Sequence, residues 1–199
     1  MASTLAGAIV AGAGQGRVEY AVDSAASQVT VHVGRAGLFA FAGHDHEIAV
    51  PGVRGTIAVD PSDAAQATVA LTFDAATMRV TGRGEPASDV PEVQRVMLSD
   101  RVLDVQRHPS ITFVSRQVGI VERTPDRLAV RVDGDLTLRG VTRSVSVPAD
   151  VRLSSDRLTA AGKVGVRQTD FGIRPVTAAA GTVRVKDDVE VVFNIVARR

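Results

Sequence analysis

The sequence predicts an all-β protein, an antiparallel barrel or sandwich of about eight strands with one or two short helices in a long connection. Three observations support this prediction. Apolar residues, valine above all, alternate with polar residues over most of the chain. Turn-forming clusters such as Thr124-Pro125-Asp126 and Arg139-Gly140 separate the alternating stretches. The segment 90–106 differs, because its apolar residues lie at helical spacing.

The expected strands follow one another along the chain. Successive side chains of a strand point to opposite faces, so alternation gives each strand one buried face and one solvated face. Antiparallel sheets show this pattern, whereas parallel strands covered on both faces form unbroken apolar runs. In chain order, we expect strands at residues 18–23, 29–33, 53–59, 67–73, 111–121, 128–138, 145–151, 160–166 and 183–195.

The helical segment has recognisable ends. Asp89 can cap a helix with Glu92 three residues further on, and Pro91 is tolerated in a first helical turn. Pro109 stops the pattern. We therefore expect one or two short helices over residues 90–106.

The pattern alone does not separate a sandwich from a barrel. Long valine-rich edge strands would invite aggregation unless they were paired, which favours closure. A barrel of about eight strands has an interior that is either filled by side chains or wide enough for one small ligand.

Composition excludes several classes of function. The chain has no cysteine, so disulfides, thiolate metal ligands and a cysteine nucleophile are excluded. With 23 Lys+Arg against 22 Asp+Glu and no basic stripe, binding to nucleic acid is not expected. No apolar run reaches the ~18 residues of a transmembrane helix. Neither a G-x-S-x-G elbow nor a phosphate-binding loop is present, so we expect no enzyme activity and no cofactor.

The N-terminal segment has some features of an export signal. Residues 5–13 (LAGAIVAGA) have the length and small apolar character of a signal core, and Ala11-Gly12-Ala13 fits a cleavage site, but the first four residues carry no positive charge. We expect residues 1–16 to be a flexible tail or the remnant of an export signal, and residues 17–199 to form one domain. A signal would place the protein in the periplasm or outside the cell; otherwise it is cytoplasmic.

Four stretches share their pattern with one known family. They are YAVD with SQVTVHVG (20–23 and 27–34), MLSDRVLDVQRHPSITFVS (97–115), VDGDLTLRGVTRSVSVP (132–148), and TDFG with VKDDVEVVFNIVA (169–172 and 185–197). In these stretches the chain resembles the YceI-like family. The hairpin at 132–148 and the P-x-I-x-F-x-S sequence at 109–115 are the most specific parts.

The resemblance implies a lipocalin-like barrel that binds a long polyisoprenoid chain without catalysis, and it is compatible with a homodimer. A carrier of an isoprenoid or other long-chain lipid needs a long apolar tunnel, because each CH₂ left in water costs about 0.8 kcal/mol. Strands rich in Val and Ala leave room for one, although strand propensity alone also enriches valine. The candidate ligand-binding residues are Val29, Val31, Val33, Leu38, Phe39, Phe41, Phe73, Met97, Ile111, Phe113, Leu136, Leu138, Phe171, Phe193 and Ile195.

The sequence Gly43-His44-Asp45-His46 permits three interpretations. On a strand, His44 and His46 would share a face about 7 Å apart, a spacing from which both can reach one metal ion. His32, His108 or Asp45 could then complete a site in a metal-binding protein or metal-dependent hydrolase, which is the alternative function. The pair could instead form a polar cap that binds a lipid head group, or it could be an ordinary hydrogen-bonded pair at a barrel rim.

Overall fold

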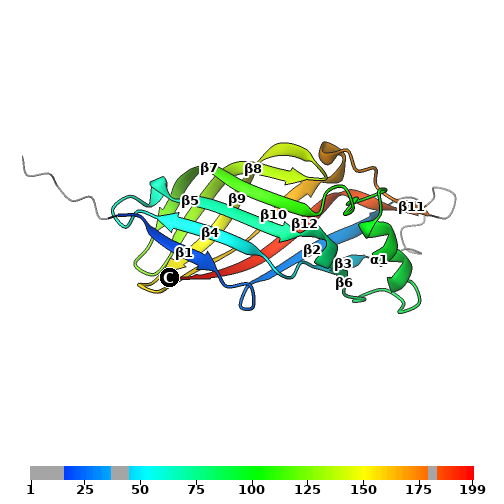
Figure 1. Ribbon diagram of the computed structural model, residues 1–199, viewed down its shortest axis with the longest axis horizontal. Helices are drawn as coiled ribbons and strands as arrows, with labels where there is room; N and C mark the ends of the chain where they lie inside the picture. Colours follow the sequence, from blue (N-terminus) through cyan, green and yellow to red (C-terminus); the bar gives the residue numbers. More distant parts are fainter. Residues whose placement is uncertain (1–15, 37–44, 179–182) are drawn as a thin grey trace, which may run out of the picture.

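The computed structural model describes residues 16–36, 45–178 and 183–199. Within these residues the strands form one antiparallel sheet that curls into an elongated, closed barrel (Figure 1). This confirms the predicted all-β antiparallel barrel. In spatial order the barrel consists of β1 (Val18–Val22), β4 (Arg54–Val59), β5 (Thr68–Asp74), β7 (Ser110–Arg123), β8 (Leu128–Leu138), β9 (Val141–Leu153), β10 (Arg157–Arg167) and β12 (Val183–Arg198), which pairs with β1 again.

Four more strands among the described residues extend the wall at one end. The first, β2 (Gln28–Ala36), pairs with β12; it is followed by β3 (His46–Ala49) and β6 (Arg79–Val80), while β11 (Thr177–Ala178) pairs with β12. Along β12, β1 and β2 lie one after the other, separated by a small loop. The backbone N–H of Val196 donates to the hydroxyl oxygen of Ser27 (3.0 Å), so this side chain replaces a ladder bond where the chain leaves the sheet.

The predicted strands agree with the observed ones apart from their ends. The short strands β3 and β6 were not predicted. Their few residues give too little alternation to recognise, and their pairing with each other joins positions at least thirty residues apart. They lie at the end of the barrel that α1 covers.

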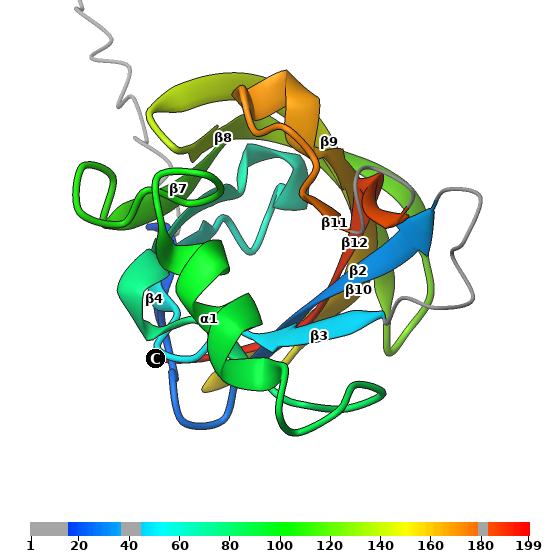
Figure 2. The ribbon, with the colours of Figure 1, turned by 90° about the vertical axis from the view of Figure 1, so that its right-hand side faces the viewer.

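The helix is shorter than predicted. α1 (Val90–Leu98) ends at Ser99, and the expected helical continuation to residue 106 is wrong: the segment forms turns, with Asp104 at a positive φ of 52°. Asp89 is the N-cap residue, but its side chain makes no capping hydrogen bond. Met97 is buried and packs with the barrel core. The helix lies over one end of the barrel, here called the helix end (Figure 2).

The opposite end, here called the far end, contains the turns between β7 and β8 and between β9 and β10. There the buried Tyr20 donates its hydroxyl hydrogen to the backbone oxygen of Ser154 at 3.1 Å. This bond joins β1 to the turn that follows β9. The barrel is therefore fixed at the far end by a buried aromatic residue.

Candidate functional site

A cavity of about 300 Å³ extends along the interior of the barrel. This volume is at the lower end of the range typical of small-molecule sites. Ile120 and Leu153 line it at the far end, and Met97 and Val102 line it at the helix end. Since Ile120 and Leu153 are 36% and 44% exposed, the cavity meets solvent at the far end. The predicted valine walls therefore enclose a hollow.

The lining is almost wholly apolar. Among the described residues that line the cavity, Gln168 alone has a polar side chain. Gln168 belongs to a short 3₁₀ helix, η4 (Gln168–Phe171), and its amide Nε2 donates to the backbone oxygen of Lys186 at 2.8 Å. Its donor group is thus already engaged with β12. The space offers a ligand dispersion contacts and very few hydrogen bonds.

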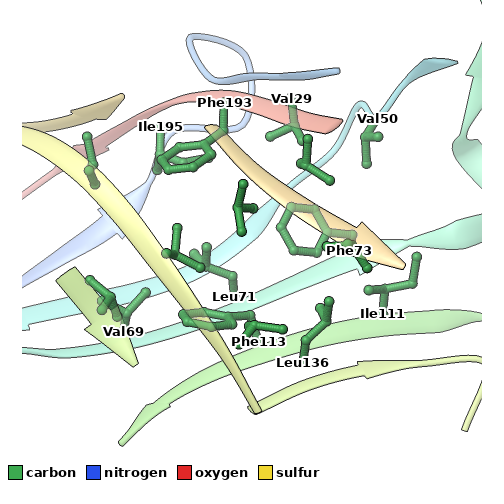
Figure 3. Close-up of a pocket in the computed structure, with 18 of the residues that line it drawn as sticks. Val29, Val50, Val69, Leu71, Phe73, Ile111, Phe113, Leu136, Phe193 and Ile195 are labelled. Atoms are coloured by element: carbon green, nitrogen blue, oxygen red, sulfur yellow. The ribbon is translucent and has the colours of Figure 1, made fainter. Parts of the chain in front are cut away.

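Most of the predicted ligand-binding residues lie around this cavity. Figure 3 shows side chains from several strands converging on one apolar space, with Phe73 and Phe193 among them. Whether they contact a ligand stays a prediction. The predicted residues that line the cavity are Val29, Val31, Val33, Phe73, Met97, Ile111, Phe113, Leu136, Leu138, Phe193 and Ile195.

The other predicted residues are placed differently. Leu38, Phe39 and Phe41 lie outside the described residues. Phe171 is 1% exposed and packs in a separate cluster with Val166 and Ile173, and it does not line the cavity. It lies in η4, after β10 has ended, and its side chain packs with Val166 and Ile173, which do line the cavity.

Sequence reasoning missed several lining residues on the strands that it had predicted correctly. Ile57 on β4 and Val69 and Leu71 on β5 all line the cavity. Val69 and Leu71 are four and two residues before Phe73, so period-two alternation places them on the same face. That signal was available from the sequence.

Two phenylalanines lie over glycines of neighbouring strands. A Cβ added at Gly134 would stand 2.7 Å from the ring of Phe113, and one added at Gly162 would stand 2.8 Å from the ring of Phe193. The rings therefore occupy space that any other residue would need for its Cβ. Because they lie against the wall in this way, the aromatic residues fill less of the barrel axis.

The short helix η4 is fixed to β12 by a second contact. The hydroxyl of Thr169 donates to Asp187 at 2.6 Å, and the backbone N–H of Thr169 donates to the same carboxylate at 2.9 Å. These two hydrogen bonds hold the pKa of Asp187 below its ordinary value of 3.8, and the bond from the hydroxyl has the larger effect. Gln168 and the segment after it are thereby positioned at the helix end of the cavity.

The histidine segment is only partly described. His44 lies outside the described residues, whereas His46 is in β3 and its Nδ1 lies 3.0 Å from Oε2 of Glu85. His32 is exposed on β2, and His108 lies beside Gly140. The described residues contain no group of three or more His, Asp or Glu side chains arranged to hold a metal ion.

Glu85 was not predicted as a site residue. The sequence indicated only a flexible glycine-rich loop at residues 82–86, because nothing local shows that this loop folds back onto β3. The side chain of Glu85 is completely buried and that of His46 is 17% exposed.

Within the part of the chain that the structure covers, no helix is long and apolar enough to cross a membrane.

Comparison with known proteins places the barrel in a family. The structure is similar to that of BcnA from Burkholderia cenocepacia, with 23% sequence identity, a TM-score of 0.69, and coverage of 88% of this chain and 99% of BcnA. It is also similar to the YceI protein of Campylobacter jejuni, with 15% identity, a TM-score of 0.58, and coverage of 76% of this chain and 84% of that protein. A mutant of the latter, with a monobromobimane guest structure, has 14% identity, a TM-score of 0.58 and the same coverage.

At these identities the structural likeness shows the shared fold. No curated protein matches the sequence. The model of the YceI-like domain, however, matches residues 20–197, from the first strand of the barrel to the last. The chain therefore belongs to the family of YceI-like domains.

Proposed function

We propose that this protein binds a long apolar lipid, in the first place an isoprenoid chain, inside the barrel and carries or stores it. The observation that supports this most directly is the cavity lined by apolar side chains, with Gln168 as the one polar residue of the described lining. Each CH₂ moved from water into such a space gains about 0.8 kcal/mol. A chain, more than a compact polar molecule, can use the whole length of the lining.

The same lining supports carriage without catalysis. A nucleophile or a general acid–base group must touch the reacting atoms. A carboxamide such as that of Gln168 is neither an acid nor a base near neutral pH, and its Nε2 is bound to Lys186. Such a cavity can hold a chain but offers it little chemistry.

The location of the protein and its oligomeric state are part of this proposal. A lipid carrier of the cell envelope would act in the periplasm or outside the cell. Fractionation of cells that produce the full chain tests the location, and recovery in the cytoplasm would contradict it. Sedimentation of the purified protein, with and without lipid, tests whether it forms a homodimer.

The binding function is tested with two neighbouring alanines of β10. Ala160 lines the cavity, whereas Ala161 is exposed on the outer face. We expect Ala160→Phe to displace the chain and Ala161→Phe to leave binding unchanged. Solvent extraction of the purified proteins followed by mass spectrometry, and titration with a prenyl alcohol, measure this. Absence of copurified lipid together with no binding by the unmodified protein would overturn the proposal.

A further inference from the structure

Gln168 is the one polar side chain that the described residues contribute to the cavity lining. Its neighbours in the lining are apolar, among them Val166 and Ile173. Gln168 is only 9% exposed. Burying an amide in such surroundings is costly unless its polar atoms form hydrogen bonds, so the partners of each atom matter.

The amide of Gln168 is held in one orientation. Its Nε2 donates to the backbone oxygen of Lys186 at 2.8 Å. A backbone oxygen can only accept, so the amide nitrogen must face β12, and Oε1 is directed away from this bond. The backbone of η4 is fixed as well, because the N–H of Ile173 donates to the backbone oxygen of Gln168 at 3.1 Å and Thr169 is bonded to Asp187.

The amide oxygen of Gln168 is left without a partner. Within the described part of the chain, the hydrogen bond of this side chain is the one from Nε2, and Oε1 accepts none. The buried side-chain atoms of the described residues that lack both a partner and accessible surface are Oε1 of Glu85 and Nε of Arg139. Oε1 of Gln168 therefore keeps accessible surface, and since its residue lines the cavity, this surface faces the hollow.

We propose that Oε1 of Gln168 accepts a hydrogen bond from the polar end of the bound lipid. The cargo is then a neutral chain that ends in a hydrogen-bond donor such as a hydroxyl, and it lies with this end at η4 and its tail toward the far end. A carbonyl oxygen needs an O–H or N–H donor. No described lining residue is charged, so an ionised head group inside the cavity would lack a counter-charge. This inference rests on the proposed function and names the chemistry and direction of its ligand.

The first test compares ligands that share one chain. Geranylgeraniol, its methyl ether and its monophosphate are titrated against the unmodified protein, Gln168→Leu and Thr169→Val. Thr169→Val removes a bond that fixes η4 but keeps the amide of Gln168, so it controls for disturbance of this segment. We expect the unmodified protein and Thr169→Val to bind the alcohol about tenfold more tightly than the ether, which leaves the amide oxygen unpaired.

Gln168→Leu should lose this preference for the alcohol, and the monophosphate should bind the unmodified protein less tightly than the alcohol does. The ratio of two ligands on one variant does not depend on how much of that variant is folded. The direction of the chain is measured by NMR. The protons on the carbon that bears the hydroxyl should show nuclear Overhauser contacts with the methyl groups of Ile173, and not with those of Leu153 at the far end.

Four outcomes would overturn the inference but not the proposed function. They are equal binding of alcohol and ether by the unmodified protein, an alcohol preference that survives in Gln168→Leu or disappears equally in Thr169→Val, tightest binding of the phosphate, and contacts of the hydroxyl end with Leu153. Failure to bind any of the three chains would instead contradict the proposed function.

Discussion

The backbone oxygen of Pro148 faces Gly162 so closely that a Cβ at position 162 would stand 2.3 Å from it. The regular ladder between β9 and β10 ends next to this contact, with the pair Asp150 and Ala161. Proline has no N–H, so it cannot continue the ladder toward β10. The two strands approach each other at this point through a contact that only glycine permits.

We therefore expect Gly162→Ala to lower the free energy of unfolding by about 1–3 kcal/mol, the usual effect of inserting a carbon into a filled space. Gly165→Ala is the matched control, because a Cβ at Gly165 would meet nothing within 4 Å. It should change stability by less than about 1 kcal/mol. Urea unfolding followed by circular dichroism measures both. Equal effects of the two substitutions would show that the contact with Pro148 is unimportant.

Arg139 allows a test of the contacts that hold the segment after η4 in place at the helix end. It occupies the turn between β8 and β9 at φ 52°, and its guanidinium donates to the backbone oxygens of Gly172 and Asp100 at 2.9 and 2.8 Å. Arg139→Asn suits the turn, since asparagine tolerates positive φ, but loses both bonds. We expect faster hydrogen exchange at Gly172 and Ile173.

The amides inside β8 and β9 should keep their protection in that variant, because the turn itself is preserved. Arg143→Gln serves as the control. Arg143 lies on the same hairpin, and its guanidinium donates to the backbone oxygen of its neighbour Thr142 at 2.9 Å. Unchanged hydrogen exchange at Gly172 and Ile173 in Arg139→Asn would mean that the guanidinium does not hold the segment after η4 in place.

The barrel wall could be predicted from the sequence because its information is local. Phe193 and Ile195 alternate with Glu190 and Asn194 along a single strand, and this pattern fixes which side chains face inward. The cavity lining follows directly from the same period. The missed residues Val69 and Leu71 follow the same alternation, so the sequence pattern also identifies them as lining residues.

The parts that could not be predicted depend on contacts between distant segments. Glu85 lies on His46 only because β6 pairs with β3 and brings the loop with it. The helix ends early because the chain reverses after Ser99, where the backbone N–H of Asp104 donates to the oxygen of Ser99 at 2.8 Å. The helical spacing of the following apolar residues gives no sign of this reversal. Phe171 is apolar, as the lining residues are, but it packs with Val166 and Ile173 and does not line the cavity.

Acid should weaken the attachment of η4 to β12. Because the hydrogen bonds from Thr169 lower the pKa of Asp187 on folding, this carboxylate stabilises the folded state above its unfolded pKa of about 3.8. The contribution is lost as the pH falls through the lower pKa of the folded state. Between about pH 5 and pH 2, the unmodified protein should therefore lose more stability than Asp187→Asn does.

Urea unfolding at a series of pH values measures this difference. Other carboxylates with a lowered pKa, such as Asp23 beside Arg198, are present in both proteins and cancel in the comparison. Thr169→Val removes the hydroxyl donor, so its free energy of unfolding should also depend less on pH than that of the unmodified protein. Parallel curves for the unmodified protein and Asp187→Asn would contradict the assignment.

Chain length gives the sharpest test of the tunnel itself. If a lipid lies along the cavity, affinity should rise about fourfold for each added CH₂ until the chain reaches the end of the lining, because each buried CH₂ contributes about 0.8 kcal/mol. Longer chains emerge at the far end, beside Ile120 and Leu153, and gain little more. Competition of prenyl and saturated alcohols against a fluorescent apolar probe measures the plateau. In Ala160→Phe the plateau should come at a shorter chain, while in Ala161→Phe it should not move. An affinity independent of length would mean that the chain stays outside the barrel.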